Sequence, residues 1–316
     1  MKLRIVAYLL ALASGLVSPS LSRPQESQRT IVRTQAIVFP DYGSYRNIEY
    51  FAPTPASYEE AIGDVRFVME KLTYRSDGLE VHAYLYRPAE PPTAQKLPVV
   101  IFNRGSYTRD EFVPEVLMPG RRLAQEGYLV IAPMLRGSGG AAGHDEMGGR
   151  DLNDLLNIET VLREVSYADM GRVFLYGESR GGIMSLLAAK SGFPARAVAT
   201  WGAITDLGEY IRNDGPYREL GRQIWAGFPE NEAQIIESRS ALYWAEQIKL
   251  PVLIMNGAAD EDVPPRHAIR LAAALADLGT PYELKIFFGE AHLPTMRAAE
   301  RDADAMRWFR RFDESR

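Results

Sequence analysis

Short apolar blocks recur along most of this chain and alternate with stretches of helical period. Residues 99–102, 129–132 and 252–255 are uninterrupted apolar blocks, and a helical pattern follows each of them after a loop. A strand that is apolar throughout is typical of a parallel sheet buried on both faces. The pattern therefore predicts an α/β fold with a mainly parallel central sheet and helices on both faces.

Other blocks extend this alternation. Two strand-like runs, at 67–74 and 79–86, flank Asp77-Gly78, a strong signal for a β-hairpin at an antiparallel edge. Further strands are predicted at residues 172–176, 197–201 and 282–288. Helices are predicted at residues 116–126, 152–165 with Asp151 as the N-cap, 264–278 and 295–312.

Residues 203–249 interrupt the alternation of strands and helices. This stretch is rich in aromatic and charged residues and is too long for a simple loop. We expect it to be an insertion that forms small helices as a cover over a functional site. Residues 23–64 are polar and lack clear periodicity, so we expect an N-terminal extension, partly ordered against one domain of residues 65–316.

The N-terminus is basic and then apolar. Lys2 and Arg4 precede an apolar run over residues 5–17, and small residues follow. The run is too short to span a membrane and is typical of a secretory signal peptide of about residues 1–22, cleaved between Gly15 and Ser22. A retained membrane anchor is the alternative. We expect an exported protein, periplasmic or secreted, with no other membrane contact.

Composition narrows the chemistry. The chain has no cysteine, which excludes disulfides, thiolate metal ligands and cysteine nucleophiles. A net charge of −5 without a long basic run gives no reason to expect nucleic-acid binding. His144-Asp145-Glu146 resembles a metal-ligand group but has no second histidine at ligand spacing, so we interpret it as a solvated loop. Arg136–Gly140 resembles a phosphate cradle without its lysine, and we interpret it as a flexible loop beside the functional site.

One motif carries candidate chemistry. An apolar run leads into Gly177-Glu178-Ser179-Arg180-Gly181, and a helical pattern follows at once. Gly-x-Ser-x-Gly between a strand and a helix is typical of a nucleophile elbow, in which the serine sits on a sharp, strained turn. The motif is short, and Ser179 as the N-cap of the following helix is the alternative interpretation.

A nucleophilic serine needs a base and a carboxylate that orients the base. In hydrolase sheets these partners follow in the order serine, acid, histidine. His292 comes just past the last predicted strand, where parallel sheets hold their chemistry. His267 lies in the first turn of an amphipathic helix and is interpreted as part of a solvated face. Asp260 is the acid nearest to the end of the preceding strand, and Asp262 is the alternative.

Further candidates surround the serine. The backbone N–H of Arg180 and the loop at Gly105 are expected to donate hydrogen bonds to an oxyanion. Arg104 or Tyr107 is expected to add a side-chain donor there. Glu178, Tyr107 and Tyr210 are candidates for substrate contact, and Glu178 would favour a positively charged substrate.

With these residues assembled, residues 65–316 resemble the catalytic domain of the prolyl oligopeptidase family, serine peptidases of the α/β-hydrolase superfamily. The resemblance implies an α/β-hydrolase fold, with Ser179 as nucleophile, Asp260 as acid and His292 as base. The matching stretches occur in order at Arg136–Gly140, Gly149–Asp154, Tyr176–Gly182, Arg239–Ala245, Asn256–Pro264 and Gly289–His292.

The chain also departs from the family. The best-known members carry a β-propeller before the catalytic domain, and residues 23–64 are too few for one. Arg104 stands near a position where the family often has a tyrosine, and Asn256 stands where a histidine is common. We predict an exported serine hydrolase that cleaves a peptide or ester bond in a small molecule or short peptide, without metal or cofactor. The resemblance favours a peptidase; a carboxylesterase and a non-catalytic binding protein are the alternatives.

Overall fold

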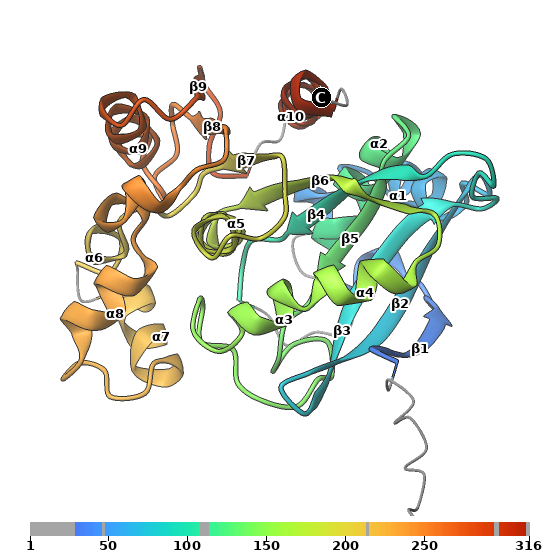
Figure 1. The fold of residues 1–316 in the computed structure, drawn as a ribbon, viewed down its shortest axis with the longest axis horizontal. Coiled ribbons are helices and arrows are strands. Elements are labelled where there is room, and N and C mark those ends of the chain that lie inside the picture. Colours follow the sequence, from blue (N-terminus) through green and yellow to red (C-terminus); the bar gives the residue numbers. More distant parts are fainter. Residues whose placement is uncertain (1–28, 46–47, 108–113, 213–214, 294–296, 314–316) are drawn as a thin grey trace, which may run out of the picture.

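The computed structural model describes residues 29–45, 48–107, 114–212, 215–293 and 297–313. Within them one sheet runs through the molecule in the order β1-β2-β3-β5-β4-β6-β7-β8-β9 (Figure 1). Its strands are β1 (Ile31–Ala36), β2 (Phe67–Ser76), β3 (Leu79–Pro88), β4 (Leu97–Asn103), β5 (Leu129–Pro133), β6 (Ala168–Glu178), β7 (Ala197–Trp201), β8 (Val252–Gly257) and β9 (Tyr282–Phe287).

Pairing in the sheet confirms the predicted α/β-hydrolase arrangement. Every pairing from β5 through β9 is parallel, whereas β1, β2, β3 and β5 pair antiparallel. Asp77 and Gly78 connect β2 to β3 with φ angles of 49° and 78°, the positive values that a tight two-residue hairpin turn requires. The sequence predicted that this hairpin forms the antiparallel edge of the sheet. The edge strand is instead β1, from the N-terminal extension, which pairs with β2.

Helices cover both faces of the sheet. Alternate side chains of β4 point to opposite faces, so Val99 and Ile101 pack with α3, α4 and α5 while Val100 and Phe102 pack with α1, α2 and α10. All four side chains are fully buried, which explains their unbroken apolar run. The helices are α1 (Pro55–Ile62), α2 (Leu117–Gln125), α3 (Leu152–Leu156), α4 (Ile158–Glu164), α5 (Arg180–Lys190), α6 (Leu207–Tyr210), α7 (Pro216–Ile224), α8 (Glu232–Arg239), α9 (Arg266–Asp277) and α10 (Ala298–Asp313).

The predicted helix over 152–165 is interrupted. α3 and α4 meet at Asn157, whose side-chain amide donates to Ser76 Oγ at 2.9 Å. Asp151 is the N-cap residue of α3, as predicted, although its side chain makes no capping hydrogen bond to the helix. Its carboxylate instead accepts hydrogen bonds from the N–H groups of Gly148 and Gly149, so it organises the loop before the helix.

The insertion between β7 and β8 forms the three helices α6, α7 and α8, which gather at one end of the molecule in Figure 1. The 3-10 turn η2 (Ile48–Tyr50) and α1 belong to the N-terminal extension, which packs on the domain through buried Tyr58 and Ala61. In the described part of the chain no helix is both long and apolar enough to cross a membrane. The predicted signal peptide, residues 1–22, lies outside the described residues.

Candidate active site

Ser179 sits on a strained turn between β6 and α5. Its φ angle is 52° with ψ at −118°, a conformation that non-glycine residues rarely adopt. The two flanking glycines permit the turn. A Cβ on Gly181 would lie 1.8 Å from the Asn103 carbonyl oxygen, and one on Gly177 would lie 2.3 Å from the Gly181 carbonyl oxygen. The motif therefore folds as a strand–turn–helix elbow, and Ser179 makes no side-chain cap bond to α5.

The structure brings Ser179, His292 and Asp260 together in one hydrogen-bonded chain. Ser179 Oγ lies 2.9 Å from His292 Nε2, and His292 Nδ1 lies 2.8 Å from Asp260 Oδ2. A carboxylate can only accept hydrogen bonds, so Nδ1 carries the proton and Nε2 of the neutral ring accepts from the serine hydroxyl. This is the geometry of a serine activated by an oriented base.

Asp260 is itself held from two sides. Its Oδ1 accepts from the Val263 N–H at 2.8 Å, and its Oδ2 accepts from Asn256 Nδ2 at 3.3 Å. The Trp201 indole N–H donates to the His292 carbonyl at 2.7 Å and fixes the loop that carries the histidine. Asn256, which stands where histidine is common in the family, thus orients the acid, a role that the sequence reading missed.

The pKa of His292 is raised. Burial alone would lower it, but the hydrogen bond and negative charge of Asp260 outweigh burial, and Asp262 and Glu178 add to the effect. The imidazolium that forms when the ring takes a proton is therefore stabilised in place.

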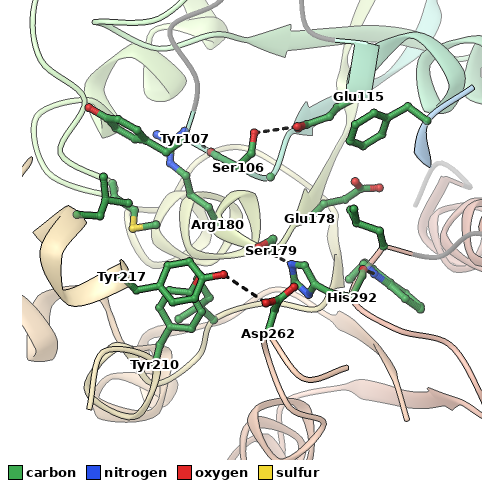
Figure 2. Close-up of a pocket in the computed structure, with 17 residues that line it drawn as sticks. Ser106, Tyr107, Glu115, Glu178, Ser179, Arg180, Tyr210, Tyr217, Asp262 and His292 are labelled. Atoms are coloured by element: carbon green, nitrogen blue, oxygen red, sulfur yellow. Dashed lines mark hydrogen bonds between the residues drawn. The ribbon is translucent and has the colours of Figure 1, made fainter. Parts of the chain in front are cut away.

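The hydrogen-bonded chain opens onto a cavity of about 470 Å³. Figure 2 shows Ser179 and His292 at its centre, with Tyr210 and Tyr217 along one side. The lining is mainly apolar and comes from the sheet loops, the insertion and the N-terminal extension. The residues are Phe51, Gly105, Ser106, Tyr107, Glu115, Met147, Glu178, Ser179, Arg180, Trp201, Ile204, Tyr210, Tyr217, Leu220, Asp262, His292 and Leu293.

Two of the predicted oxyanion groups lie beside the serine. Arg180 directly follows Ser179 as the first residue of α5. A Cβ on Gly105 would lie 3.3 Å from the Ser179 Cβ, so the Gly105 backbone passes against the nucleophile. The predicted side-chain donors do not fit. Arg104 is buried outside the lining and donates to the carbonyl oxygen of Gly105 at 2.9 Å, and the Tyr107 hydroxyl points away from Ser179 (Figure 2).

Glu178 lines the cavity, but its carboxylate is already engaged. Arg301 Nη1 lies 2.5 Å from Glu178 Oε1, and Arg301 Nη2 pairs with Asp302 Oδ1. Burial raises the pKa of Glu178, and the positive charge of Arg301 only partly counters this. The hypothesis that Glu178 attracts a positively charged substrate therefore loses support, because a cation is already present beside it.

Three interpretations of the other polar residues were wrong. His267 is not on a solvated face: it is 1% exposed, and burial lowers its pKa to about 4. Asp145 is not in a solvated loop: it is 2% exposed and pairs with Arg180. Arg136 is likewise packed, bonded to Asp154, and lies outside the cavity lining. Asp262, the alternative acid, lines the cavity and accepts from the Tyr217 hydroxyl at 3.4 Å.

Among the described residues, no group of three or more histidine, aspartate or glutamate side chains is arranged to hold a metal ion.

Comparison with known proteins identifies the family. A model of the prolyl oligopeptidase family matches residues 121–314, well over half of the chain. The chain belongs to this family. By class it is a serine-type peptidase, and the resemblance inferred from the ordered motifs is confirmed.

Within the family, the chain is 28% identical over 215 residues to the uncharacterized peptidase YtmA of Bacillus subtilis, an alignment that covers 67% of this chain and 81% of YtmA. It is 25% identical over 262 residues to the human acylamino-acid-releasing enzyme, covering 74% of this chain but 34% of that enzyme. A puromycin-hydrolyzing peptidase of Mycobacterium tuberculosis superposes with a TM-score of 0.67 at 25% identity, covering 79% of this chain and 40% of the other. This chain thus spans less than half the length of these two larger relatives.

Proposed function

We propose that this protein hydrolyses peptide bonds in small molecules or short peptides through an acyl-enzyme on Ser179. The observation that carries the proposal is the Ser179–His292–Asp260 hydrogen-bonded chain at the wall of the cavity. The family and relatives named as peptidases support a peptide substrate. A cavity of about 470 Å³ is in the size range of small-ligand sites and would accept a short substrate.

The first half-reaction forms the acyl-enzyme. Ser179 Oγ attacks the substrate carbonyl carbon while His292 Nε2 takes the hydroxyl proton, and Asp260 stabilises the imidazolium. The Arg180 N–H and the backbone at Gly105 receive the developing oxyanion. The tetrahedral intermediate then collapses, the C–N bond breaks, and His292 returns the proton to the leaving amine. The acyl group remains on Ser179 as an ester.

The second half-reaction consumes one water. His292 Nε2 takes a proton from the water as its oxygen attacks the ester carbonyl. The bond to Ser179 Oγ breaks, the serine regains its proton from His292, and a carboxylic acid leaves. These steps use only the side chains and backbone groups described above.

A panel of aminoacyl and acyl-aminoacyl p-nitroanilides against p-nitrophenyl esters tests this function. We expect turnover of at least one anilide, and its loss in Ser179→Ala. Turnover confined to esters would replace the peptidase by a carboxylesterase on the same site. If the folded protein turns over neither anilides nor esters, the hypothesis of a non-catalytic binding protein is favoured.

We also propose that the protein is exported. The support is the sequence of residues 1–22, with its basic start, apolar run and small residues. N-terminal sequencing of the protein recovered from its native host tests this. We expect a mature N-terminus just after a residue between Gly15 and Ser22, in an extracytoplasmic fraction; protein that keeps Met1 and stays in the cytoplasm contradicts export.

A further inference from the structure

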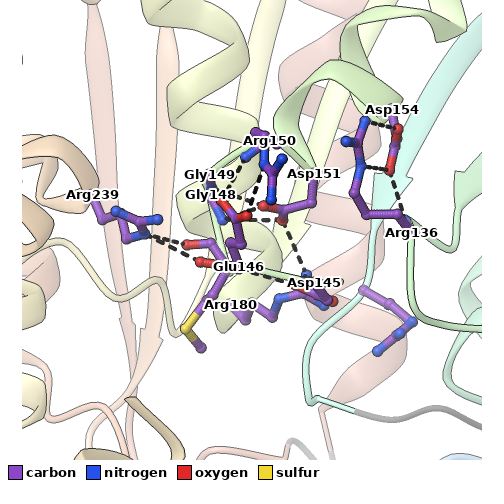
Figure 3. Close-up of polar contacts among 12 residues, drawn as sticks. Arg136, Asp145, Glu146, Gly148, Gly149, Arg150, Asp151, Asp154, Arg180 and Arg239 are labelled. Atoms are coloured by element: carbon purple, nitrogen blue, oxygen red, sulfur yellow. Dashed lines mark hydrogen bonds and ion pairs between the residues drawn. The ribbon is translucent and has the colours of Figure 1, made fainter. Parts of the chain in front are cut away.

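The side chain of Arg180, which directly follows the nucleophile, forms a buried ion pair. Arg180 is 2% exposed, and its Nη2 lies 2.6 Å from each carboxylate oxygen of Asp145. Asp145 is equally buried, and Figure 3 shows the pair at the centre of a polar cluster. The residue whose backbone N–H faces the proposed oxyanion is therefore anchored by a loop distant in sequence.

The same carboxylate holds part of the cavity wall. Asp145 Oδ1 accepts from the Met147 N–H at 2.9 Å, and Met147 lines the cavity with a φ angle of 52°. Asp151 secures the next residues by accepting from the Gly148 and Gly149 N–H groups, and lies 3.5 Å from Arg180 Nη2. Burial and the charge of Asp145 raise the pKa of Asp151 to about 6.

The insertion clamps this loop from its other side. Arg239 of α8 donates through Nε to the Met147 carbonyl at 3.0 Å, and the Trp225 indole N–H donates to the Glu146 carbonyl at 2.8 Å. On the opposite flank, Arg180 Nη1 lies 3.4 Å from the Ser106 carbonyl, in the loop that contains Gly105. The Arg180 guanidinium therefore lies between the loop after β4 and the loop at 145–149.

We infer that Asp145 is a positioning residue, which acts through the Arg180 guanidinium to hold the oxyanion-binding backbone and the Met147 wall in register. The inference rests on the proposed function, because it assigns Asp145 a part in the hydrolysis at Ser179. With the pair broken, the elbow keeps its serine, but the first turn of α5 loses its closest link to the loop at 145–149, and only the longer contacts to Asp151 and the Ser106 carbonyl remain. Small displacements of such donors cost much of the stabilisation of the transition state.

The chain offers a matched control in a second buried pair. Arg136 Nη2 lies 2.6 Å from Asp154 Oδ1, and Asp154 Oδ2 also accepts from the Arg136 N–H at 2.7 Å. Asp154 is fully buried, and neither partner lines the cavity. Loss of either carboxylate removes the closest partner of a buried guanidinium and leaves a second carboxylate near it, Asp77 at 2.8 Å from Arg136 Nη2 and Asp151 at 3.5 Å from Arg180 Nη2. Only one of the two guanidinium groups adjoins the nucleophile.

The experiment compares Asp145→Asn with Asp154→Asn in the full chain. The measurements are the thermal midpoint, kcat and KM for p-nitrophenyl butyrate, and the second-order rate of labelling by a fluorophosphonate probe. Both variants are expected to lower the thermal midpoint. Only Asp145→Asn is expected to lower kcat and the labelling rate, on the order of 10- to 100-fold at a temperature where both are folded. Equal changes in the two variants overturn the inference.

Arg180→Lys and Arg136→Lys decide the matter if Asp145→Asn does not fold. Lysine keeps the buried charge but cannot make the paired contact to a carboxylate. Arg180→Lys should then lose labelling rate and Arg136→Lys should keep it; retained labelling in Arg180→Lys contradicts the inference. Ser179→Ala runs in parallel. If labelling of the wild type does not depend on Ser179, both the proposed function and the inference fail. If the wild type is active but the Asp145 and Arg180 variants behave like the Asp154 and Arg136 variants, only the inference fails.

Discussion

Ser179 and Tyr217 face the same cavity, but different kinds of contact place them there. Ser179 lies between strand β6 and helix α5, on a turn that depends on a backbone approach of Gly181 to the Asn103 carbonyl. Tyr217 lies on α7 of the insertion and is placed by side chains: its ring centroid is 4.2 Å from that of Tyr210, and its hydroxyl bonds to Asp262. The difference indicates that the backbone of the sheet sets the chemistry, whereas the insertion sets the shape of the cavity.

Asp260 and Asp262 offer the sharpest test on the sheet side. Asp260→Asn should lower kcat by about 10⁴-fold, because an amide no longer fixes the tautomer of His292 that carries its proton on Nδ1. Asp262→Asn, two residues away in the same loop, should stay within a few-fold of wild type at pH 8. Steady-state kinetics of both variants check this, and a larger loss in Asp262→Asn would exchange their roles.

Gly181 tests whether the elbow depends on backbone fit. Gly181→Ala should lose activity by about 100-fold and destabilise the fold by about 1–3 kcal/mol, since its Cβ would overlap the Asn103 carbonyl. Gly208→Ala in α6 is the matched change in the insertion, where a Cβ would meet side chains and no backbone, the flexible Ile236 side chain at 3.2 Å and Asp206 Oδ1 at 3.4 Å. Urea unfolding and kcat measurements compare them; equal tolerance of both changes would show that the elbow can relax.

Tyr217 tests the insertion side. Tyr217→Ala removes an aromatic wall without touching the hydrogen-bonded chain, so KM should rise by about 10-fold for substrates that fill the cavity, with little change in kcat. Short acyl groups should be less affected than long or aromatic ones. Kinetics over a series of acyl chain lengths measure this. A fall in kcat with unchanged KM would mean that the insertion also takes part in the chemistry.

The smallest expected effect is a shift in pH dependence, which involves both His292 and the Asp262 side chain that Tyr217 of the insertion contacts. His292 must be neutral to act as a base, and its pKa is raised above 6.5, so kcat/KM should fall on the acid side with a midpoint above that value. The charge of Asp262 contributes to the raised pKa, and Asp262→Asn should therefore move the midpoint down. A pH–rate profile between pH 5 and 9 checks the direction. An upward shift would contradict the account of the charges around His292.

What the sequence predicts in this molecule follows from the regular order of strands and helices. The apolar run before Gly177 and the helical pattern after Gly181 were enough to predict the elbow, and the order of Asp260 and His292 along the chain predicted which residues meet Ser179. These inferences depend on one or two neighbouring elements of a regular sheet, where pattern and geometry are closely linked.

What sequence missed depends on distant partners. Asp145 looked solvated because its partner Arg180 belongs to another segment that no motif links to it. His267 looked exposed for the same reason, since it contacts Thr205 from the insertion. Phe51 lines the cavity although it belongs to an extension with no regular pattern. No periodic pattern in the sequence predicts such contacts, since they arise only when loops meet in the folded chain.

The central claim is that Ser179 is the nucleophile, and covalent labelling tests it most directly. Wild-type protein treated with a fluorophosphonate probe at pH 8 should gain one adduct, which peptide mass spectrometry should place on Ser179. His292→Ala should label far more slowly, and Ser179→Ala should not label. An adduct on another residue, or labelling that persists in Ser179→Ala, would contradict the account.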